Sequence, residues 1–372
     1  MTNGTRSQID TLVIGGGQAG LAVGYHLARG EVPFLILDAN DRTGDSWRHR
    51  WDSLKLFTPN RFNSLPGLQI PGEDWGFPTK DHVANYLEAY AGHFGLPIRH
   101  RTRVDALTRR GNGFVATAGA DEFEADNVIV AMADFQRPKV PALASELDSE
   151  ITQLHVADYK NPSQLRAGAV LVVGLGNSGA EIALELVRDR RVWLSGKPTA
   201  VQPFRPERLS GRILMPFVGP IIFNRLLTTS TPMGRKLRAK ILHKAAPLLR
   251  VKPKDLAAAG VERVARTVGV VDGRPALEDG TVLDVANVVW CTGFDRGFSW
   301  IDLPIYDGSC ELAHERGVPS SVPGLYFVGL KFLYSMLSDT LLSIGRDSRH
   351  VVDHLVSRRE ARDAVTTQAS VE

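Results

Sequence analysis

Cysteine is scarce in this chain of 372 residues, which contains only two, Cys291 and Cys310. They do not form a C-x-x-C pair, so a redox-active disulfide of the thioredoxin-reductase kind is not expected. Cys291 fits a small buried residue of a strand instead. No histidines and cysteines have the spacing of metal ligands, so no metal site is predicted. Neither a catalytic disulfide nor a metal centre is therefore expected to carry the chemistry of this protein.

Long apolar runs are also absent. Residues 1–8 are polar and lack the apolar core of a signal peptide. The longest apolar stretch, residues 213–223, contains two prolines and a glycine and is too short to span a bilayer. These features predict a cytoplasmic protein without a transmembrane segment.

The net charge is small, +3, but the charges are distributed unevenly. Residues 151–290 carry 21 Lys and Arg against 11 Asp and Glu, whereas the rest of the chain carries 23 against 30. A basic central segment suits a ligand that is rich in phosphate. Eight basic residues and no acid lie in residues 235–254. A solvated helical face is the simplest interpretation of this stretch, and contact with a membrane surface or an acidic partner is the alternative. No motif supports nucleic-acid binding.

Two glycine-rich turns each follow an apolar strand and open an alanine-rich helix. Residues 15–20 have the sequence Gly-Gly-Gly-Gln-Ala-Gly, and residues 174–179 have the sequence Gly-Leu-Gly-Asn-Ser-Gly. Both fit G-x-G-x-x-G: the first glycine makes the tight turn, the second lets the backbone approach a pyrophosphate, and the third lets the helix pack on the strand. Two such turns predict two bound dinucleotides. The expected contacts are Gly15, Gly17, Gln18, Ala19 and Gly20 at the first turn and Gly174, Gly176, Asn177, Ser178 and Gly179 at the second.

The two halves of the chain resemble each other beyond these turns. Residues 126–131 predict a buried strand that ends 116 residues after Gly15, and residues 286–291 predict one that ends 117 residues after Gly174. Near-equal spacing indicates two copies of one fold unit. We therefore predict an α/β protein with two Rossmann-like dinucleotide-binding domains.

The residue that ends the second strand of each unit distinguishes the two ligands. Asp38 follows an apolar strand, and an acid there accepts hydrogen bonds from free ribose hydroxyls, as in FAD or NAD. The corresponding strand of the second unit leads into Ser195, Gly196 and Lys197, with no acid, which favours the 2′-phosphate of NADPH. The consistent assignment is FAD in the first unit and NADPH in the second. An exposed loop charge is the alternative interpretation of Lys197.

A long loop after Asp38, residues 41–59, is rich in aromatic residues and interrupted by proline. Its length indicates a functional segment rather than a simple connection. A core patch of Trp and Phe would explain the aromatic residues, but not their place directly behind a ribose-binding acid. We expect this loop to cover the flavin, and the contacts expected in this region are Ala39, Ser46, Trp47 and Thr58.

Further motifs are spread over nearly the whole chain. They are Gly44-Asp-Ser-Trp47, Leu54-Lys-Leu-Phe-Thr-Pro59, Trp290-Cys-Thr-Gly-Phe294, Gly324-Leu-Tyr-Phe-Val-Gly329 and Gly345-Arg-Asp347. Together with the glycine turns, they resemble the class B flavin-containing monooxygenases, in particular compact bacterial members related to the plant YUCCA enzymes. The resemblance implies an FAD domain formed by residues 1–150 and 291–372, with an NADPH domain, residues 151–290, inserted into it. It also implies that the last helix points at the flavin ring. Additional cofactor contacts are expected at Val104, Thr292, Gly293, Gly329 and Gly345.

One fingerprint of this family, F-x-G-x-x-x-H-x-x-x-[FWY], is only half present. His155 and Tyr159 stand in register, but Ser149 replaces the aromatic residue and Ile151 replaces the glycine. In the family this segment links the domains and helps to position the nicotinamide cofactor. The resemblance therefore makes His155 and Tyr159 the candidate catalytic residues, whereas a histidine without this register would be interpreted as structural. Phe57, where animal members place an asparagine near the flavin, is a second departure.

The resemblance implies a monooxygenase in which NADPH reduces FAD and a C4a-(hydro)peroxyflavin transfers one oxygen atom from O2 to a small-molecule substrate. The segments 62–77 and 332–336 are apolar with aromatic residues, which suggests a small lipophilic substrate. One alternative is an NADPH-dependent flavoprotein reductase that passes electrons to a quinone or a protein acceptor. Another is a non-enzymatic flavoprotein, against which both intact glycine turns argue. The sequence is compatible with a homodimer.

Overall fold

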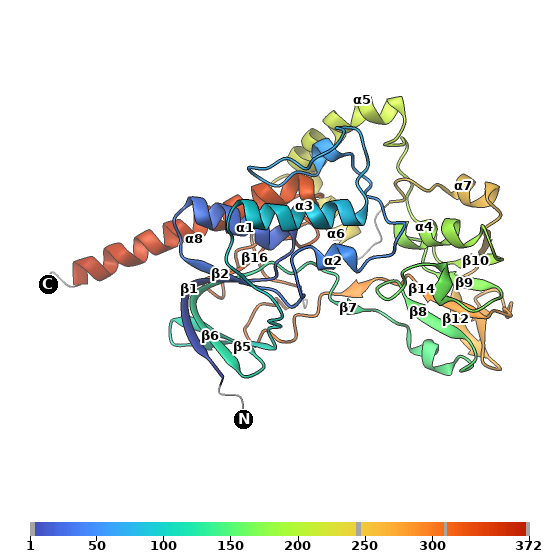
Figure 1. Ribbon diagram of the computed structural model, residues 1–372, viewed down its shortest axis with the longest axis horizontal. Helices are drawn as coiled ribbons and strands as arrows, with labels where there is room; N and C mark the ends of the chain where they lie inside the picture. Colours follow the sequence, from blue (N-terminus) through green and yellow to red (C-terminus); the bar gives the residue numbers. More distant parts are fainter. Residues whose placement is uncertain (1–3, 243–246, 309–310, 370–372) are drawn as a thin grey trace.

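The computed structural model describes residues 4–242, 247–308 and 311–369. They fold into two units, each built on a parallel sheet; the first lies at the left of Figure 1 and the second at the right. Each sheet contains the strand that leads into one of the two glycine turns. The predicted α/β fold with two Rossmann-type units is confirmed.

The first sheet has seven strands among the described residues, in the order β3-β2-β1-β6-β5-β4, with β16 paired to the end of β6. Leu12 and Val13 in β1 are fully buried, because one face of the sheet packs on helices and the other on the segment 298–333. The strands β4, β5 and β6 form an antiparallel meander. The bounds are β1 (Arg6–Ile14), β2 (Phe34–Leu37), β3 (Ile98–Arg99), β4 (Ala106–Arg110), β5 (Gly113–Ala118), β6 (Asp121–Val130) and β16 (Leu325–Phe327).

The second sheet has five parallel strands in the described part of the chain, in the order β11-β10-β9-β14-β8. Its strands are short and almost continuously apolar, as expected for a sheet that is covered on both faces. A hairpin, β12 with β13, follows β11. The bounds are β8 (Thr152–His155), β9 (Val170–Val173), β10 (Val192–Ser195), β11 (Glu262–Val264), β12 (Thr267–Val271), β13 (Arg274–Leu277) and β14 (Asn287–Trp290).

The two sheets share one strand arrangement. In the first, Ile14 at the end of β1 pairs with Val130 at the end of β6, and in the second Val173 pairs with Trp290 in the same way. This register confirms the repeat that the equal spacing predicts. The strand that pairs with the outer side of the closing strand differs in origin between the two sheets. In the first sheet it is β16, beside β6, from the end of the chain, and in the second it is β8, beside β14, which precedes β9 in the sequence.

The chain crosses between the units twice, and the two crossings pair with each other. β7 (Arg137–Pro138) and β15 (Phe294–Asp295) form a two-stranded antiparallel ribbon. Beyond β7, Ala144 and Leu147 already pack with Trp290 of the second sheet. We propose that this ribbon marks the boundary between the units, before residue 150 at the first crossing and after residue 290 at the second, where the resemblance implies the boundaries.

Helices cover the sheets around the glycine turns. α1, α3 and α8 share a core with one face of the first sheet, and α8 runs along α1 (Figure 1). In the second unit, α4 and α7 pack on the sheet. Among the described residues, no helix has the length and hydropathy needed to cross a membrane. The bounds are α1 (Gln18–Arg29), α2 (Asp45–Arg48), α3 (Lys80–His93), α4 (Asn177–Leu186), α7 (Pro253–Ala258) and α8 (Leu341–Ala369), with 3-10 turns η1 (Asn60–Phe62), η2 (Ala142–Glu146) and η3 (Pro162–Gln164).

A helical excursion leaves the second unit after β10 and packs on the first. Thr228 forms a bridge to Ser335, and the Thr229 N–H donates to the Tyr334 carbonyl at 2.8 Å. The excursion therefore belongs to the second unit in sequence but joins both units in space, and α5 lies at the top edge of the molecule in Figure 1. Its elements are α5 (Leu209–Phe217), the π-helix η4 (Val218–Leu226) and α6 (Pro232–Ile241).

Candidate functional site

The first glycine turn, residues 15–20, has the geometry that its sequence predicts. Gly15 has a φ of +109°, and its N–H donates to the Leu37 carbonyl at 2.8 Å. A Cβ on Gly20 would lie 1.9 Å from the Gly15 carbonyl oxygen, so only glycine allows α1 to pack this closely. A Cβ on Gly17 would meet nothing within 4 Å. This open space lies at the start of α1, where no side chain caps the helix and free N–H groups attract an anion.

Asp38 lies against this turn at the end of β2. It is buried, and its Oδ1 accepts hydrogen bonds from the backbone N–H and the Nδ2 of Asn40, at 3.1 and 2.8 Å. Its Oδ2 lies 2.6 Å from the position that a Cβ on Gly16 would take, so this oxygen faces the turn. The neighbouring Ala39 is exposed. Asp38 is thus placed as the predicted ribose-binding acid requires.

The loop behind β2 lies between the two units. Trp47 Nε1 donates to Gln18 Oε1 at 3.2 Å, which ties the loop to the start of α1. The Trp47 ring packs against the cores of both units, and Trp51 belongs to the core of the second. Of the other contacts expected here, Ser46 is exposed and Thr58 is half-buried. The loop therefore reaches from the first glycine turn to the second unit.

Two glycines from the end of the chain pack close to α1. Gly329, after β16, has a φ of +83°, and a Cβ there would lie 2.9 Å from the Cβ of Ala19. Gly345, in α8, accepts at its carbonyl from His26 Nε2 at 3.1 Å, and a Cβ there would lie 2.5 Å from a proline ring. Gly329 therefore lets the chain approach the start of α1, whereas Gly345 makes room for the proline ring and bonds to α1 through His26. Val104 is half-buried against the core on the other face of the sheet.

The second glycine turn, residues 174–179, repeats the first. Gly174 has a φ of +122°, and its N–H donates to the Ser195 carbonyl at 2.8 Å. A Cβ on Gly179 would lie 1.9 Å from the Gly174 carbonyl oxygen, the same distance as in the first turn. Gly176 precedes α4, whose first N–H groups have no side-chain cap, and Ser178 is half-buried. This turn therefore also presents free N–H groups to an anion.

Two polar residues near the second turn are engaged inside the protein. Asn177 Nδ2 donates to the Pro247 carbonyl at 2.9 Å, and its Oδ1 accepts the Leu249 N–H at 2.9 Å. Ser195 is fully buried; its Oγ donates to the Ala265 carbonyl and accepts from the Thr267 N–H, both at 2.8 Å. The structure therefore gives Ser195 a different role from the one expected, because its hydroxyl holds β10 against the start of β12.

Gly196 and Lys197 form the loop above the second glycine turn. Gly196 has a φ of +153°, and a Cβ there would lie 3.0 Å from the Leu175 nitrogen. Thr199 Oγ1 donates to the Leu175 carbonyl at 3.0 Å and holds the loop in place. Lys197 is exposed, and in the part of the chain that the structure describes its ammonium group has no carboxylate partner. This cation is available to a phosphate.

His155 contacts the linker between the units, which is the ribbon of β7 and β15 with the residues next to it. Its Nδ1 accepts the Ala157 N–H at 3.2 Å, so the ring proton lies on Nε2, which donates to the Gly293 carbonyl at 3.0 Å. The same carbonyl accepts the Lys139 N–H at 3.0 Å, and Thr292 Oγ1 donates to the Lys139 carbonyl. Burial lowers the pKa of His155, which keeps the ring neutral at pH 7. His155 therefore positions the turn after β14 against the linker strand.

Tyr159 lies in the core of the second unit. Its side chain is fully buried, and its hydroxyl donates to Glu185 Oε2 on α4 at 2.8 Å. Burial, followed by the effect of this carboxylate, raises the pKa of Tyr159. The structure therefore gives Tyr159 a packing role in place of the expected catalytic one. Burial also raises the pKa of Cys291 to about 12, so its thiol stays protonated, and Cys310 lies outside the described residues.

Residues 12–214 match the family model described as pyridine nucleotide-disulphide oxidoreductase. The chain is 38% identical to an uncharacterized CzcO-like oxidoreductase of Geobacillus kaustophilus, over 94% of this chain and 99% of the relative. It is 30% identical to a probable indole-3-pyruvate monooxygenase, YUCCA7, of Arabidopsis thaliana, over 78% of this chain and 75% of the relative. A flavin-containing monooxygenase from Stenotrophomonas maltophilia has the same fold, with a TM-score of 0.70 at 26% identity, over 95% of this chain and 99% of that one. The chain belongs to the flavin-containing monooxygenase family.

As a flavin-containing monooxygenase family member, the protein is an oxidoreductase whose cofactors are FAD and NADPH. The residues present fit these groups. The open space beside Gly17 can take the FAD diphosphate, with Asp38 beside it for the ribose. The N-terminus of α4 and Lys197 offer N–H groups and a cation to NADPH.

Sequence patterns did not single out Arg50, which the structure places beside the ribbon between the two units. Its guanidinium lies 5.6 Å from the ring centre of Phe135 and 5.7 Å from that of Phe294. Burial lowers the pKa of Arg50, and no carboxylate among the described residues pairs with it. A partly buried cation without a partner is costly and indicates a site for an anion. The signal in the sequence was a basic residue between two tryptophans, Trp47 and Trp51.

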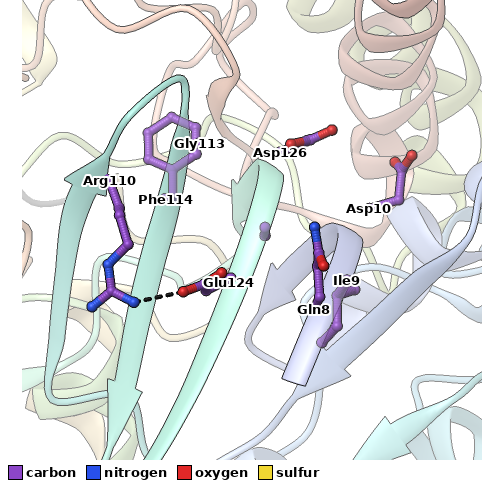
Figure 2. Close-up of a pocket in the computed structure, with 9 residues that line it drawn as sticks. Gln8, Ile9, Asp10, Arg110, Gly113, Phe114, Glu124 and Asp126 are labelled. Carbon is purple, nitrogen blue, oxygen red and sulfur yellow. Dashed lines mark hydrogen bonds and ion pairs between the residues drawn. The ribbon is translucent and has the colours of Figure 1, made fainter. Parts of the chain in front are cut away.

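A pocket of about 420 Å³ on the first sheet is separate from this site. Figure 2 shows Gln8 and Asp10 of β1 on one side of it and Arg110 on the other, where Arg110 donates to Glu124 at 2.5 Å. These residues lie toward the start of β1, whereas the glycine turn follows its end. Parallel α/β sheets bind dinucleotides at the carboxyl ends of their strands, so the pocket is on the opposite side from the cofactors.

Proposed function

We propose that the protein is an FAD- and NADPH-dependent monooxygenase that inserts one atom of O2 into a small lipophilic substrate. The observation that carries the proposal is the loop shared by both nucleotide sites. Trp47 bonds to Gln18 beside the first glycine turn and packs on the cores of both units. A common support of this kind can hold a nicotinamide and a flavin in a reactive orientation. Similarity to flavin monooxygenases over most of the chain supports the same reaction class.

The residues of the chain would act by binding and positioning. The N-termini of α1 and α4 bind the two diphosphates, Asp38 binds the FAD ribose, and Lys197 binds the 2′-phosphate of NADPH. His155 keeps the linker turn in place, and Arg50 supplies a positive charge beside it. When bound, FAD would supply the redox chemistry, namely hydride acceptance from NADPH and reaction with O2. The protein must orient the two rings and exclude water from them.

The segments 62–77 and 332–336 are the proposed substrate contacts. Phe62 packs edge-on against Trp75, with 6.2 Å between ring centres. Tyr334 is stacked by two guanidinium groups, at 3.7 and 4.7 Å from its ring centre. The aromatic residues of the two segments favour a small lipophilic substrate, and the candidate classes are an amine, a sulfur compound, a ketone and a 2-oxo acid.

A second candidate is an NADPH-dependent reductase that passes electrons to a quinone or a protein acceptor. It needs the same two nucleotide sites but no protected oxygen chemistry. Two observations favour it: the family fingerprint lacks its aromatic residue and glycine at Ser149 and Ile151, and Tyr159 binds Glu185 inside the core.

Oxygen balance distinguishes these two candidates. We expect the purified protein, given NADPH and a panel of amines, sulfides, ketones and 2-oxo acids, to oxygenate at least one compound with label from ¹⁸O2. NADPH, O2 and product should then be used and formed in equal amounts, because one oxygen atom enters the product and the other leaves as water. Rapid anaerobic electron transfer to a quinone, with no labelled product from any compound, would establish the reductase instead.

Lys197→Ala is expected to weaken NADPH binding by about 10–150-fold and to leave NADH binding nearly unchanged, because a hydrogen bond to a charged group is lost only with the 2′-phosphate. Titration of each nucleotide against the oxidised holoprotein measures both affinities. Lys254→Ala, which removes another exposed lysine of the same unit, is the matched control. Equal losses for NADPH and NADH would show that Lys197 does not bind the 2′-phosphate.

A further inference from the structure

α5 and η4 expose a continuous stripe of large apolar side chains. Positions four apart lie on one face of an α-helix, and positions five apart do so in a π-helix. At 1.5 Å per residue the stripe is roughly 25 Å long. An apolar surface of this extent marks an interaction site. The stripe, here called the apolar ridge, consists of Leu209, Ile213, Phe217, Ile221 and Leu226, which are 73, 58, 60, 43 and 53% exposed.

The apolar ridge faces outward because the opposite side of the excursion, which carries Gly211 and Gly219, packs against the rest of the protein. Gly211 is buried, and a Cβ there would lie 2.2 Å from the Arg205 carbonyl oxygen. A Cβ on Gly219 would lie 3.4 Å from the Leu342 side chain of α8. Small residues therefore attach this segment to the body, and the large ones are left to solvent. An ordinary surface helix has the reverse arrangement.

Cations accompany the apolar ridge. Residues 208–242 contain no Asp or Glu. Arg212 lies 5.8 Å from the ring centre of Trp75, whose loop contributes two acids, Glu73 and Asp74. These two acids do not balance the cations, so the surface is basic as well as apolar. The exposed basic residues of the excursion are Arg208, Arg212, Arg225, Arg235, Lys236 and Lys240.

We propose that the apolar ridge and its cations bind the surface of an anionic lipid bilayer, with the helix lying in the plane of the interface. Large apolar side chains on one face, with arginine and lysine beside them, are the features that hold a helix at such a surface. A second copy of the chain fits less well, because a symmetric interface places each patch against itself and brings the same cations face to face.

The apolar ridge lies before the basic stretch, residues 235–254, that the sequence singled out, and this stretch adds Arg235, Lys236 and Lys240 to its cations. In that stretch Arg238 Nε donates to the Phe332 carbonyl at 3.3 Å, and Lys252 Nζ donates to backbone carbonyls. Residues 243–246 lie outside the described residues. Part of the positive charge of this stretch is thus used inside the protein, and the exposed apolar surface lies before it.

Sedimentation of the holoprotein with vesicles tests the proposal without turnover, so the result is independent of the proposed reaction. The probes are vesicles of phosphatidylcholine alone and vesicles that also contain phosphatidylglycerol. We expect binding to the anionic vesicles, weakened by high salt. Ile213→Ser combined with Phe217→Ser should lower the partition coefficient at least about tenfold, because two large apolar side chains no longer enter the interface. Arg212→Gln combined with Arg225→Gln should remove most of the dependence on phosphatidylglycerol.

Val268→Ser combined with Val271→Ser is the matched control, because these two valines are also exposed but lie on β12, away from the excursion. The control should bind vesicles as the wild type does, and flavin content should verify the fold of every variant. The proposal is overturned if the wild type binds neither kind of vesicle, or if the control loses as much binding as the ridge variant. A wild-type dimer that the ridge variant converts to a monomer, with no vesicle binding, would assign the apolar ridge to a second copy instead.

Discussion

A colourless protein is the expected result of Gly17→Val. The Cβ of residue 17 meets nothing within 4 Å, so the chain can fold with valine there. The added methyl groups then occupy the space at the start of α1, where the FAD diphosphate would meet the backbone N–H groups. Losing two hydrogen bonds to a charged group lowers affinity by about 100-fold or more. Flavin absorbance of the purified variant, and FAD titration of the apoprotein, measure the loss.

Gly269→Val is the matched control for this substitution. A Cβ on Gly269 also meets nothing within 4 Å, and this glycine lies in strand β12, where valine is well tolerated. The control should keep its FAD and its melting temperature. Full FAD occupancy in Gly17→Val would contradict the placement of the diphosphate at the first glycine turn.

Weaker NADPH binding with undiminished stability is the expected result of Arg50→Leu. The guanidinium packs on Phe135 and Phe294 and has no carboxylate partner among the described residues, so the apoprotein does not depend on its charge. If the charge binds an anionic group of NADPH, its loss should lower the affinity by about 10–150-fold. The melting temperature should stay the same or rise, because an unpaired, partly buried cation is removed. Rapid-mixing measurement of flavin reduction against NADPH concentration gives the affinity.

Arg61→Leu is the control for the stacking itself. The Arg61 guanidinium also lies over two aromatic rings, at 5.4 Å from Phe62 and 5.0 Å from Trp75, but on a loop away from the linker. This variant should reduce its flavin with NADPH at wild-type affinity. An Arg50→Leu variant that melts at a lower temperature and binds NADPH normally would show that Arg50 is only a packing residue.

Local sequence determined the geometry of the two glycine turns of this protein. Gly15 and Gly174 have positive φ, and Gly20 and Gly179 lie in close contact with the backbone. Both features depend only on residues within the turn itself. The repeat follows from the same kind of information, because the spacing from turn to closing strand sets which strand pairs with which. The position of Asp38 directly after β2 was enough to predict where this acid lies.

Only the tertiary structure decided what several polar side chains do. The sequence suggested that Ser195 binds phosphate, but its hydroxyl donates to the Ala265 carbonyl and accepts the Thr267 N–H, both far along the chain. Tyr159 matched a family register, yet its partner Glu185 lies on a helix of the second core. The position of Arg50 became significant only in the folded chain, where the two crossings between the units bring Phe135 and Phe294 beside its guanidinium. A backbone conformation is set by neighbouring residues, whereas a polar side chain bonds to whichever group the folded chain places within about 3 Å of it.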